Sequence, residues 1–277
     1  MATSAATKEF SYSAADFQAV RKKLKLLTGI NLADSKDSMV YSRLARRIRT
    51  LRLSSFLQYL NYLDSNTNSE QEEFVNALTT NLTSFFRESH HFVALEEHLR
   101  KNQKPTTIWC AASSTGEEPY SIAMSAVNAF GGFNCPVKII ASDIDSNVLQ
   151  SASAGIYRAD QIKDLSLALK QRFFHRGKGN QDGKVKIVPE LRKMIKFQKL
   201  NLMDDAWSLS NNIDIVFCRN VMIYFDKSTQ VAILEKIVKH MAPDSLYFAG
   251  HSENFANVSD ILSPLGKTIY KPNRALK

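Results

Sequence analysis

The chain has 277 residues, a hydrophobic content of 44% and a formal net charge of +9. Its length suits one large or two modest domains, and its apolar content excludes a chain that is disordered throughout. No apolar run approaches the ~18 residues that a membrane span requires, and the N-terminal residues lack the basic patch and apolar core of an export signal. The three cysteines are widely spaced and form no C-x-x-C pair, which argues against a disulfide framework and against a metal site. We therefore expect a soluble, cytoplasmic protein without a metal ion.

The positive charge is concentrated near the N-terminus. Residues 20–53 contain ten lysines and arginines against two aspartates, and the rest of the chain is nearly neutral. A local basic patch of this kind is typical of proteins that contact nucleic acid, an anionic membrane or an acidic protein surface.

Residues 10–100 have the pattern of consecutive helices, and we expect a helical domain over residues 1–100. Within residues 37–52, apolar side chains recur at helical spacing. These apolar positions are Val40, Leu44, Ile48 and Leu51. The basic positions on the other side are Arg46 and Arg49, with Arg43 and Arg52 flanking them. The arginines are therefore expected to face away from the core of this domain.

After a polar linker near Pro105, short apolar strands alternate with helices. The expected strands are 107–112, 137–143 and 213–220, and the expected helices are 119–130 and 146–154. This alternation predicts an α/β domain over residues 101–277, with a parallel sheet of Rossmann type. Residues 171–200 contain several glycines and two short strands, near 184–188 and 194–199. We expect this segment to form a small antiparallel insert.

Ligands of open α/β sheets bind beyond the carboxyl ends of the strands. The first expected strand ends in 111-AASSTGEEPYS-121, whose small residues allow a ligand to approach the backbone closely. Gly116 is its only glycine, so the segment is not a phosphate-binding G-x-G-x-x-G loop, and Glu117 and Glu118 would repel phosphate. The segment favours a ligand with a positive centre.

The second expected strand ends at Asp143, where an acidic side chain is the usual partner of a ribose diol. A strand-end aspartate can also cap the next helix, and Asp145 is a candidate for that role. Together, the small-residue turn, the acidic pair and Asp143 describe a nucleoside pocket that avoids phosphate and accepts a cation. S-adenosylmethionine has that chemistry.

Five motifs carry a resemblance to a known family: 80-TNLTSFFRESHHF-92, 114-STGEEPYSIA-123, 141-ASDID-145, 217-FCRNVMIYFD-226 and 249-AGHSENF-255. From about residue 15 to its end, the chain resembles the CheR family of chemotaxis-receptor glutamate methyltransferases. The resemblance implies an all-helical N-terminal domain and a Rossmann-like class I methyltransferase sheet. It also implies that S-adenosylmethionine is the methyl donor and that receptor glutamates become methyl esters for adaptation.

The resemblance implies a set of residues that contact the cofactor: Asn81, Thr83, Arg87, Glu118, Asp143, Asn201, Leu202, Arg219 and Asn220. Tyr224 and Arg87 would lie at the site of methyl transfer, although Tyr224 can also be a strand-end aromatic that packs on the sheet. Glu117 and Glu118 are both able to reach the amino group of the cofactor, and the resemblance alone favours Glu118. His251 and Glu253 are expected to shape a turn.

The segment 80–92 admits more than one interpretation. Asn81-Leu82-Thr83 fits the N-glycosylation pattern, which loses its context in the cytoplasm. Phe85 and Phe86 would exclude water from a cofactor pocket while the Arg87 guanidinium binds a carboxylate. The alternative is that the two phenylalanines belong to the core and that Arg87 makes a surface ion pair.

The expected partners are chemotaxis receptors. We expect an acidic helical methylation region to dock on the basic face formed by Arg43, Arg46, Arg49 and Arg52, and a C-terminal receptor tail to bind the insert near Gly179 and Gly183. Two other functions stay open: a nucleic-acid methyltransferase, and an adaptor that keeps the cofactor pocket without turnover. Residues 218–225 lack the Asp/Asn-Pro-Pro-aromatic pattern of exocyclic amine methylation, and aromatic residues do not alternate with the basic cluster. We therefore expect neither nucleic-acid binding nor membrane insertion.

Overall fold

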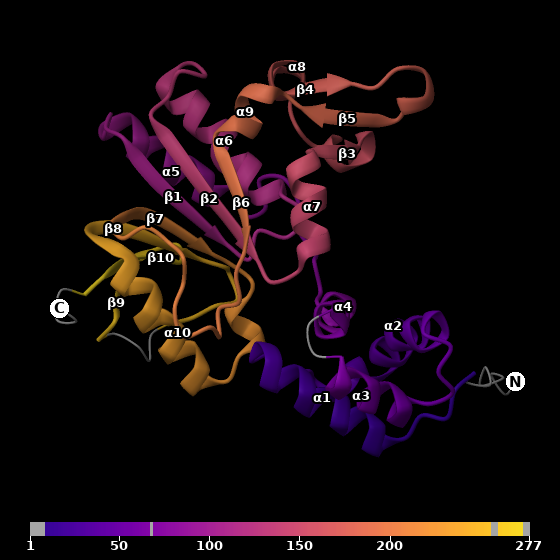
Figure 1. Ribbon diagram of the computed structural model, residues 1–277. Coiled ribbons are helices and arrows are strands. Elements are labelled where there is room, and N and C mark those ends of the chain that lie inside the picture. Colours follow the sequence, from indigo (N-terminus) through magenta and orange to yellow (C-terminus); the bar gives the residue numbers. More distant parts are fainter. Residues whose placement is uncertain (1–8, 67–68, 256–259, 274–277) are drawn as a thin grey trace, which may run out of the picture. The chain divides into compact units, whose positions relative to one another are not determined.

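The computed structural model describes residues 9–66, 69–255 and 260–273, and the chain folds as two compact units (Figure 1). The first unit runs to Thr80 and includes Tyr224–Asp226, and the second contains the remaining residues. Within the described ranges, no helix has both the length and the apolar character needed to cross a membrane.

The first unit is all helical, as predicted. Its α-helices are α1 (Ala14–Thr28), α2 (Asp37–Thr50), α3 (Phe56–Ser65) and α4 (Ser69–Leu78), with a short 3₁₀ turn η1 (Asp34–Lys36) before α2. Ser13 and Asp16 form a capping box at the start of α1, and Gly29 ends that helix in the left-handed conformation.

Helix α2 packs through its predicted apolar positions. Val40, Leu44 and Ile48 are fully buried. On a neighbouring side of the helix, Arg47 forms a bidentate ion pair with buried Glu70 of α4, at 3.1 and 2.6 Å, and Tyr59 donates a hydrogen bond to the same carboxylate. Because this charge pair is partly buried and fully hydrogen-bonded, it fixes the register between α2 and α4.

The second unit contains a seven-stranded sheet in the order β6-β2-β1-β7-β8-β10-β9 (Figure 1). Its strands are β1 (Thr106–Ala111), β2 (Val137–Asp143), β6 (Ile195–Lys199), β7 (Ile213–Cys218), β8 (Met241–Ala249), β9 (Leu262–Gly266) and β10 (Ile269–Pro272). The first five strands in this order are parallel, and β10 runs antiparallel to both β8 and β9. The predicted Rossmann-like sheet is confirmed.

Both faces of this sheet are buried. Ile108, Cys110 and Phe217 point into a core shared with helices α5 (His90–Lys101) and α6 (Glu117–Phe130). Alternate residues of the same strands, such as Trp109 and Val216, are equally buried and face the other side. Helices α7 (Ser146–Ala154) and α10 (Lys227–His240) complete the main elements. Helix α5 belongs to this second unit, whereas the sequence pattern placed it in the helical domain.

The insert is a separate three-stranded antiparallel sheet in the order β3-β5-β4. It consists of β3 (Ile156–Arg158), β4 (Phe174–Arg176) and β5 (Lys184–Ile187), with short helices η2 (Ala159–Ile162), α8 (Leu167–Phe173), η3 (Gly179–Gln181) and α9 (Pro189–Lys193). The expectation that 194–199 belongs to the insert was wrong, because these residues form β6 and pair with β2 in the main sheet. The partners of β5 are instead β3 and β4.

Candidate active site

The carboxyl ends of the parallel strands define one edge of the main sheet. The chain moves outward from β1 to β2 and β6, and then returns to β7 on the other side of β1. This reversal makes the ends of β1 and β7 the topological switch point, where open α/β sheets bind their ligands. The loops 112–116 and 219–222 leave the sheet at this point.

The loop after β1 has a close-packed and unusual backbone. Gly116 has φ +99°, and a Cβ there would lie 2.8 Å from both Ala152 Cβ and Tyr157 Oη. Positive φ angles also occur at five non-glycine residues around this edge: Phe86, Glu88, Ala112, Ser114 and Asn220. Such conformations cost free energy and cluster at functional sites.

Asp143 closes β2 and is nearly buried. Its two carboxylate oxygens accept hydrogen bonds from the backbone N–H groups of Asp145, at 3.0 Å, and of Ser114, at 2.8 Å. Burial raises the pKa of Asp143 to about 6, although these backbone donors oppose the shift. The carboxylate retains acceptor capacity, since each oxygen has two lone pairs and can accept further donors such as a ribose diol.

Asn81 is tied to the loops after β1 and β2. Its side-chain amide donates to Asp145 Oδ2 at 2.9 Å, and its carbonyl accepts from Ser114 Oγ at 3.2 Å. Asp145 also caps α7, as expected, by accepting from two backbone N–H groups of the first turn. The segment that begins at Asn81, including half-buried Thr83, is therefore anchored at the sheet edge within the second unit.

A buried ion cluster lies at the end of β7. Arg219 has no exposed side-chain surface, and its guanidinium donates to Glu118 at 2.6 Å and pairs with Glu88 at 3.1 Å. Burial raises the pKa of Glu118 even though Arg219 opposes the shift. Burial would also raise the pKa of Glu88, but Arg219 and nearby hydrogen-bond donors hold it below its usual value. The carboxyl group of Glu118 is thus held beside β1, where Cys110 Sγ donates to it at 3.2 Å.

The two adjacent glutamates of α6 have different surroundings. Glu117 is buried and accepts from Thr115 Oγ1 at 2.6 Å and from Gln161 Nε2 at 3.3 Å. Gln161 lies in η2 of the insert. The carboxylate of Glu117 therefore braces the β1 loop against the insert, while Glu118 faces the ion cluster.

The sequence predicted only that Glu253 shapes a turn. In the structure its side chain also binds the backbone of the loop after β7. Its carboxylate, 4% exposed, accepts from the backbone N–H groups of Asn220, Val221, Met222 and Gly250, at 2.6 to 3.0 Å. The motifs after β7 and β8 are thereby joined. Glu88 adds to this connection by accepting from Asn220 Nδ2 and from the backbone of His251. No sequence pattern for this pairing exists, because it depends on two strands that are adjacent only in the fold.

The residues of the FFR motif have separate roles in the second unit. Phe85 packs edge-on against Tyr157 and Phe174 and belongs to the core, whereas partly buried Phe86 packs edge-on against Phe92 at the margin of that core. Arg87 is half-buried, and its guanidinium donates to the carbonyl of Leu82 at 2.9 Å. That bond uses one of the five N–H groups of the guanidinium.

The remaining predicted site residues fall in two places. Asn201 and Leu202 follow β6, directly after the hydrogen bond from the Leu200 N–H to the Asp143 carbonyl. They therefore lie at the same sheet edge as Asp143. Tyr224 belongs to the first unit, where its carbonyl accepts a hydrogen bond from the Asn31 N–H at 2.7 Å.

The four predicted docking arginines differ in their surroundings. Arg43 donates to the carbonyls of Ala77 and Thr79, at 3.1 and 2.5 Å, and so caps the end of α4. Arg49 forms an ion pair with Glu9. Arg46 and Arg52 are exposed.

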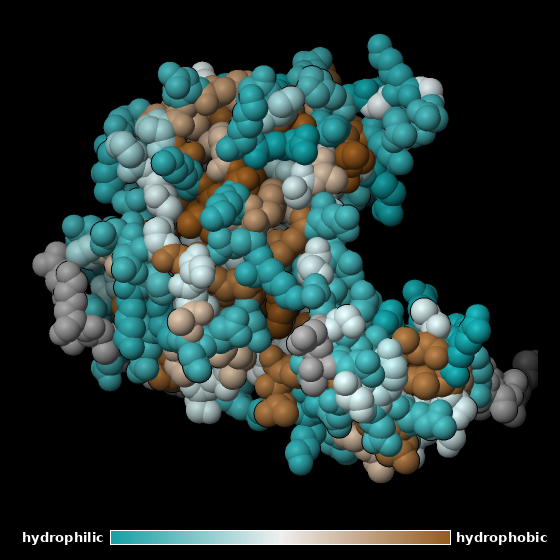
Figure 2. Space-filling model, viewed as in Figure 1, coloured by the Kyte–Doolittle hydropathy of each residue, from teal (hydrophilic) through white to brown (hydrophobic). Residues whose placement is uncertain are grey.

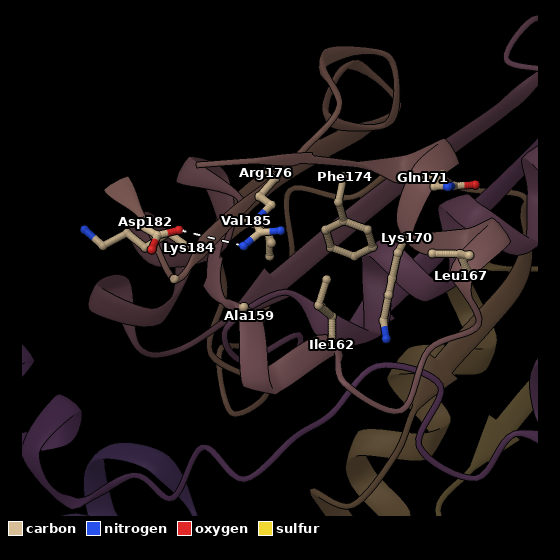
Figure 3. A pocket seen from close by; sticks show the side chains of 11 residues that line it. Ala159, Ile162, Leu167, Lys170, Gln171, Phe174, Arg176, Asp182, Lys184 and Val185 are labelled. Atoms are coloured by element: carbon tan, nitrogen blue, oxygen red, sulfur yellow. Dashed lines mark ion pairs between the residues drawn. The ribbon is translucent and has the colours of Figure 1, made fainter. Parts of the chain in front are cut away.

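The insert has a hollow of about 640 Å³, shown from close by in Figure 3. Ile162, Phe174 and Val185 provide its apolar lining, while Lys170 and Lys184 bring positive charge. Figure 2 shows the projecting tip of this β4–β5 hairpin as mostly hydrophilic. The hollow thus combines an apolar floor with basic side chains.

Comparison with known proteins decides the family. Residues 15–79 match the description "CheR methyltransferase, all-alpha domain", and residues 81–271 match "CheR methyltransferase, SAM binding domain". The chain belongs to the CheR family. The junction of the two matches coincides with the division between the two structural units.

Three relatives of this CheR chain align over almost its whole length. "Chemotaxis protein methyltransferase 2" of Pseudomonas aeruginosa is 52% identical, covering 95% of this chain and 95% of the relative. "Chemotaxis protein methyltransferase" of Salmonella typhimurium is 47% identical, covering 95% and 92%. The Escherichia coli protein of the same name is 46% identical, covering 95% and 93%.

The residues at the sheet edge fit S-adenosylmethionine, the cofactor of this family's second domain. Gly116 holds the β1 loop in a positive-φ conformation closely packed against Ala152 and Tyr157, and Asp143 offers a buried carboxylate at the place of a ribose partner. Glu117 and Glu118 at the start of α6 disfavour a phosphate. These three carboxyl groups therefore suit a nucleoside with a cationic rather than an anionic substituent.

Proposed function

We propose that this CheR family member methylates glutamate side chains on the cytoplasmic part of chemotaxis receptors, giving glutamyl methyl esters. The observation that carries the proposal is the arrangement of Asp143 and the Glu118–Arg219 pair at the switch point of a chain that belongs to this family. Identities of 46 to 52% with proteins named chemotaxis protein methyltransferase support the choice of substrate.

In this proposal the residues around the sheet edge hold the cofactor. Asp143 accepts hydrogen bonds from the ribose, and Asn201 and Leu202 flank the adenosine. Glu118 attracts the amino group of the methionine portion, since it is the glutamate held on the β1 side of α6 by Arg219 and Cys110. Asn81, Thr83, Arg87, Arg219 and Asn220 complete the contacts.

Methyl transfer to a carboxylate requires few catalytic groups from the protein. The sulfonium of the bound cofactor supplies an activated methyl group to the attacking carboxylate. A glutamate with a reference pKa of about 4.3 is already ionised at neutral pH, so no general base is required. Charge is neutralised as the reaction proceeds, and a strong oxyanion hole would therefore oppose it. The protein contributes alignment of the two reactants and exclusion of water.

Arg87 is proposed to align the glutamate, and the proposed role of Tyr224 in methyl transfer rests on the family resemblance alone. The guanidinium of Arg87 uses one N–H group to bind the Leu82 carbonyl, and its planar fork suits a carboxylate. The Arg87 carbonyl also accepts from Arg219 at 2.5 Å, so this backbone is tied to the ion cluster that holds Glu118. Alignment of the substrate and of the cofactor is thus linked through one buried cation.

Helix α2 is the proposed docking site for the acidic methylation region of the receptor. Arg46 of α2 and Arg52, two residues after the helix ends, are exposed and carry the main attraction, with Arg49 alongside them in its pair with Glu9. Arg43 contributes less directly, because it is engaged at the end of α4. The attraction should weaken as salt rises, since exposed charges are screened beyond roughly 8 Å at physiological ionic strength.

The insert is the proposed site for a C-terminal receptor tail. Strands β3 and β4 are the two edges of its sheet, and an extended peptide can add to such an edge. Gly179 and Gly183 have φ of +59° and +77° in the β4–β5 turn, and a Cβ on Gly177 would lie 2.0 Å from the Gln181 carbonyl oxygen. Shortening this turn should therefore abolish tail binding and leave cofactor binding intact.

The test is methyl transfer from label-bearing S-adenosylmethionine to a purified receptor fragment. Glutamyl methyl esters release labelled methanol in mild alkali, and methylated amines do not. Alkali-labile label on the receptor supports the proposal, and stable label on nucleic acid would favour the nucleic-acid alternative. Tight binding of S-adenosylhomocysteine without any transfer would favour an adaptor.

A further inference from the structure

A short turn links the end of β6 to the rest of the second unit. The Asn201 carbonyl accepts from the Asp204 N–H at 3.1 Å, and Asn201 Oδ1 accepts from the Met203 N–H at 3.0 Å. These bonds close residues 201–204 into one turn, which carries both Asn201 and Leu202 at the sheet edge beside Asp143. We call this segment the 201–204 turn.

Lys236 of α10 binds the same turn from outside. Its ammonium donates to the Leu202 carbonyl at 2.9 Å and to the Asp204 carbonyl at 2.8 Å. Among the residues that the structure describes, no backbone N–H donates to either carbonyl, so a cation with several N–H donors suits the position. Burial lowers the pKa of Lys236, while Asp205 and Asp204 oppose that shift.

Trp207 holds the turn from a third direction. Its indole N–H donates to the Asn201 carbonyl at 3.1 Å, and the Lys236 ammonium lies 4.8 Å from the centre of its ring. The ring also packs edge-on against Trp109, whose own indole N–H donates to Ser142 Oγ, next to Asp143. The two tryptophans of the protein therefore connect the 201–204 turn to the end of β2 through a continuous series of contacts.

We infer that Lys236 is a positioning residue for the cofactor: it fixes the 201–204 turn, together with Trp207, in the conformation that the adenosine requires. This inference rests on the proposed cofactor role of Asn201 and Leu202. In this inference Lys236 acts through two backbone carbonyls, those of Leu202 and Asp204, and not by a contact of its own with the cofactor. Its loss leaves the carbonyls of Leu202 and Asp204 without their charged donor, and the turn becomes free to move away from the pocket.

The inference predicts separate effects on binding and on turnover. Lys236→Met, which keeps the aliphatic stem and removes the ammonium, should weaken S-adenosylhomocysteine by up to about tenfold, because only the part of these charge-assisted hydrogen bonds that orders the turn for the ligand appears in the affinity. The KM for S-adenosylmethionine should rise by a similar factor and kcat should stay within about twofold, since uniform binding is lost. Trp207→Phe removes the indole donor and should weaken the ligand in the same direction.

The experiment measures calorimetric affinity for S-adenosylhomocysteine together with tryptophan emission, and Lys239→Met is the matched control. Lys239 is an exposed lysine of the same helix, so its replacement makes the same change in charge. Unliganded Lys236→Met should already have a shifted emission spectrum, because the surroundings of Trp207 change, and Lys239→Met should not. Thermal melting confirms that each variant is folded.

Three results would overturn the inference. They are an unchanged affinity in Lys236→Met, equal losses in Lys236→Met and Lys239→Met, or a loss confined to kcat. Failure of the wild-type protein to bind S-adenosylhomocysteine would instead contradict the proposed function itself, so the two failures are distinguishable.

Discussion

Protonation of Asp143 should switch off much of the cofactor affinity. The proposed pocket uses the ionised carboxylate as a hydrogen-bond acceptor for the ribose, and the pKa of this group is raised to about 6 by burial. Below that pH the free protein carries a protonated Asp143, and binding must first remove the proton. The affinity for S-adenosylhomocysteine should therefore be constant above about pH 7 and fall by up to about tenfold per pH unit below pH 6.

The effect of this residue on stability has the opposite sign. The folded pKa of Asp143 lies above the reference value of 3.8, so the fold favours the protonated form. The stabilising contribution of Asp143 is fully present below pH 3.8 and is lost as pH rises through about 6. Weaker binding at pH 5.5 therefore cannot be ascribed to unfolding driven by this group.

Asp143→Ala removes the acceptor at every pH. One charge-assisted hydrogen bond is worth ~1.5–3 kcal/mol, so the affinity at pH 7.5 should fall about ten- to hundredfold. The matched control is Asp164→Ala, which removes an exposed acid from the same unit. The measurement is the calorimetric affinity for S-adenosylhomocysteine of the wild type and both variants from pH 5 to pH 8. A wild-type affinity that does not change with pH, or an Asp143→Ala variant that keeps the wild-type pH dependence, would contradict this role of Asp143.

Three further substitutions test other parts of the site. Gly116→Ala should lower the free energy of unfolding by about 1–3 kcal/mol in urea, because its Cβ meets Ala152 and Tyr157 at 2.8 Å; Gly132→Ala, where nothing lies within 4 Å, should change it little. Arg219→Met should lower the free energy of unfolding by about 3–5 kcal/mol, since it leaves the carboxylates of Glu118 and Glu88 without their buried cation. An unchanged midpoint of urea unfolding would contradict a stabilising role of this ion cluster. Arg87→Ala should reduce kcat more than it reduces cofactor affinity, and equal losses would make Arg87 a simple binding residue.

The sequence predicted the elements whose signal is local. The strands that became β1, β2 and β7 are short apolar runs, and the Asp145 cap and the apolar stripe of α2 follow from spacing alone. Residues 194–199 were also correctly predicted as a strand, but they were assigned to the insert and not to the main sheet. Strand pairing depends on what lies beside a strand in space, and here the whole insert separates β6 from its partner β2 along the chain.

The supporting residues of the site were harder to predict for the same reason. Glu253 binds the backbone of a loop more than thirty residues earlier, and Glu88 pairs with an arginine from a distant strand end. Neither residue has a distinctive pattern in its own neighbourhood. The family motifs drew attention to the segments that contain them, but only the three-dimensional arrangement reveals which atoms meet.

The central claim is tested most directly by peptide mass spectrometry of a receptor fragment incubated with this protein and S-adenosylmethionine. The account predicts that particular glutamates gain the mass of one methylene group, that mild alkali removes it, and that Asp143→Ala lowers the yield at limiting cofactor. If the protein binds S-adenosylhomocysteine tightly and the modification appears on lysine, on nucleic acid or nowhere, receptor glutamate methylation is not its function.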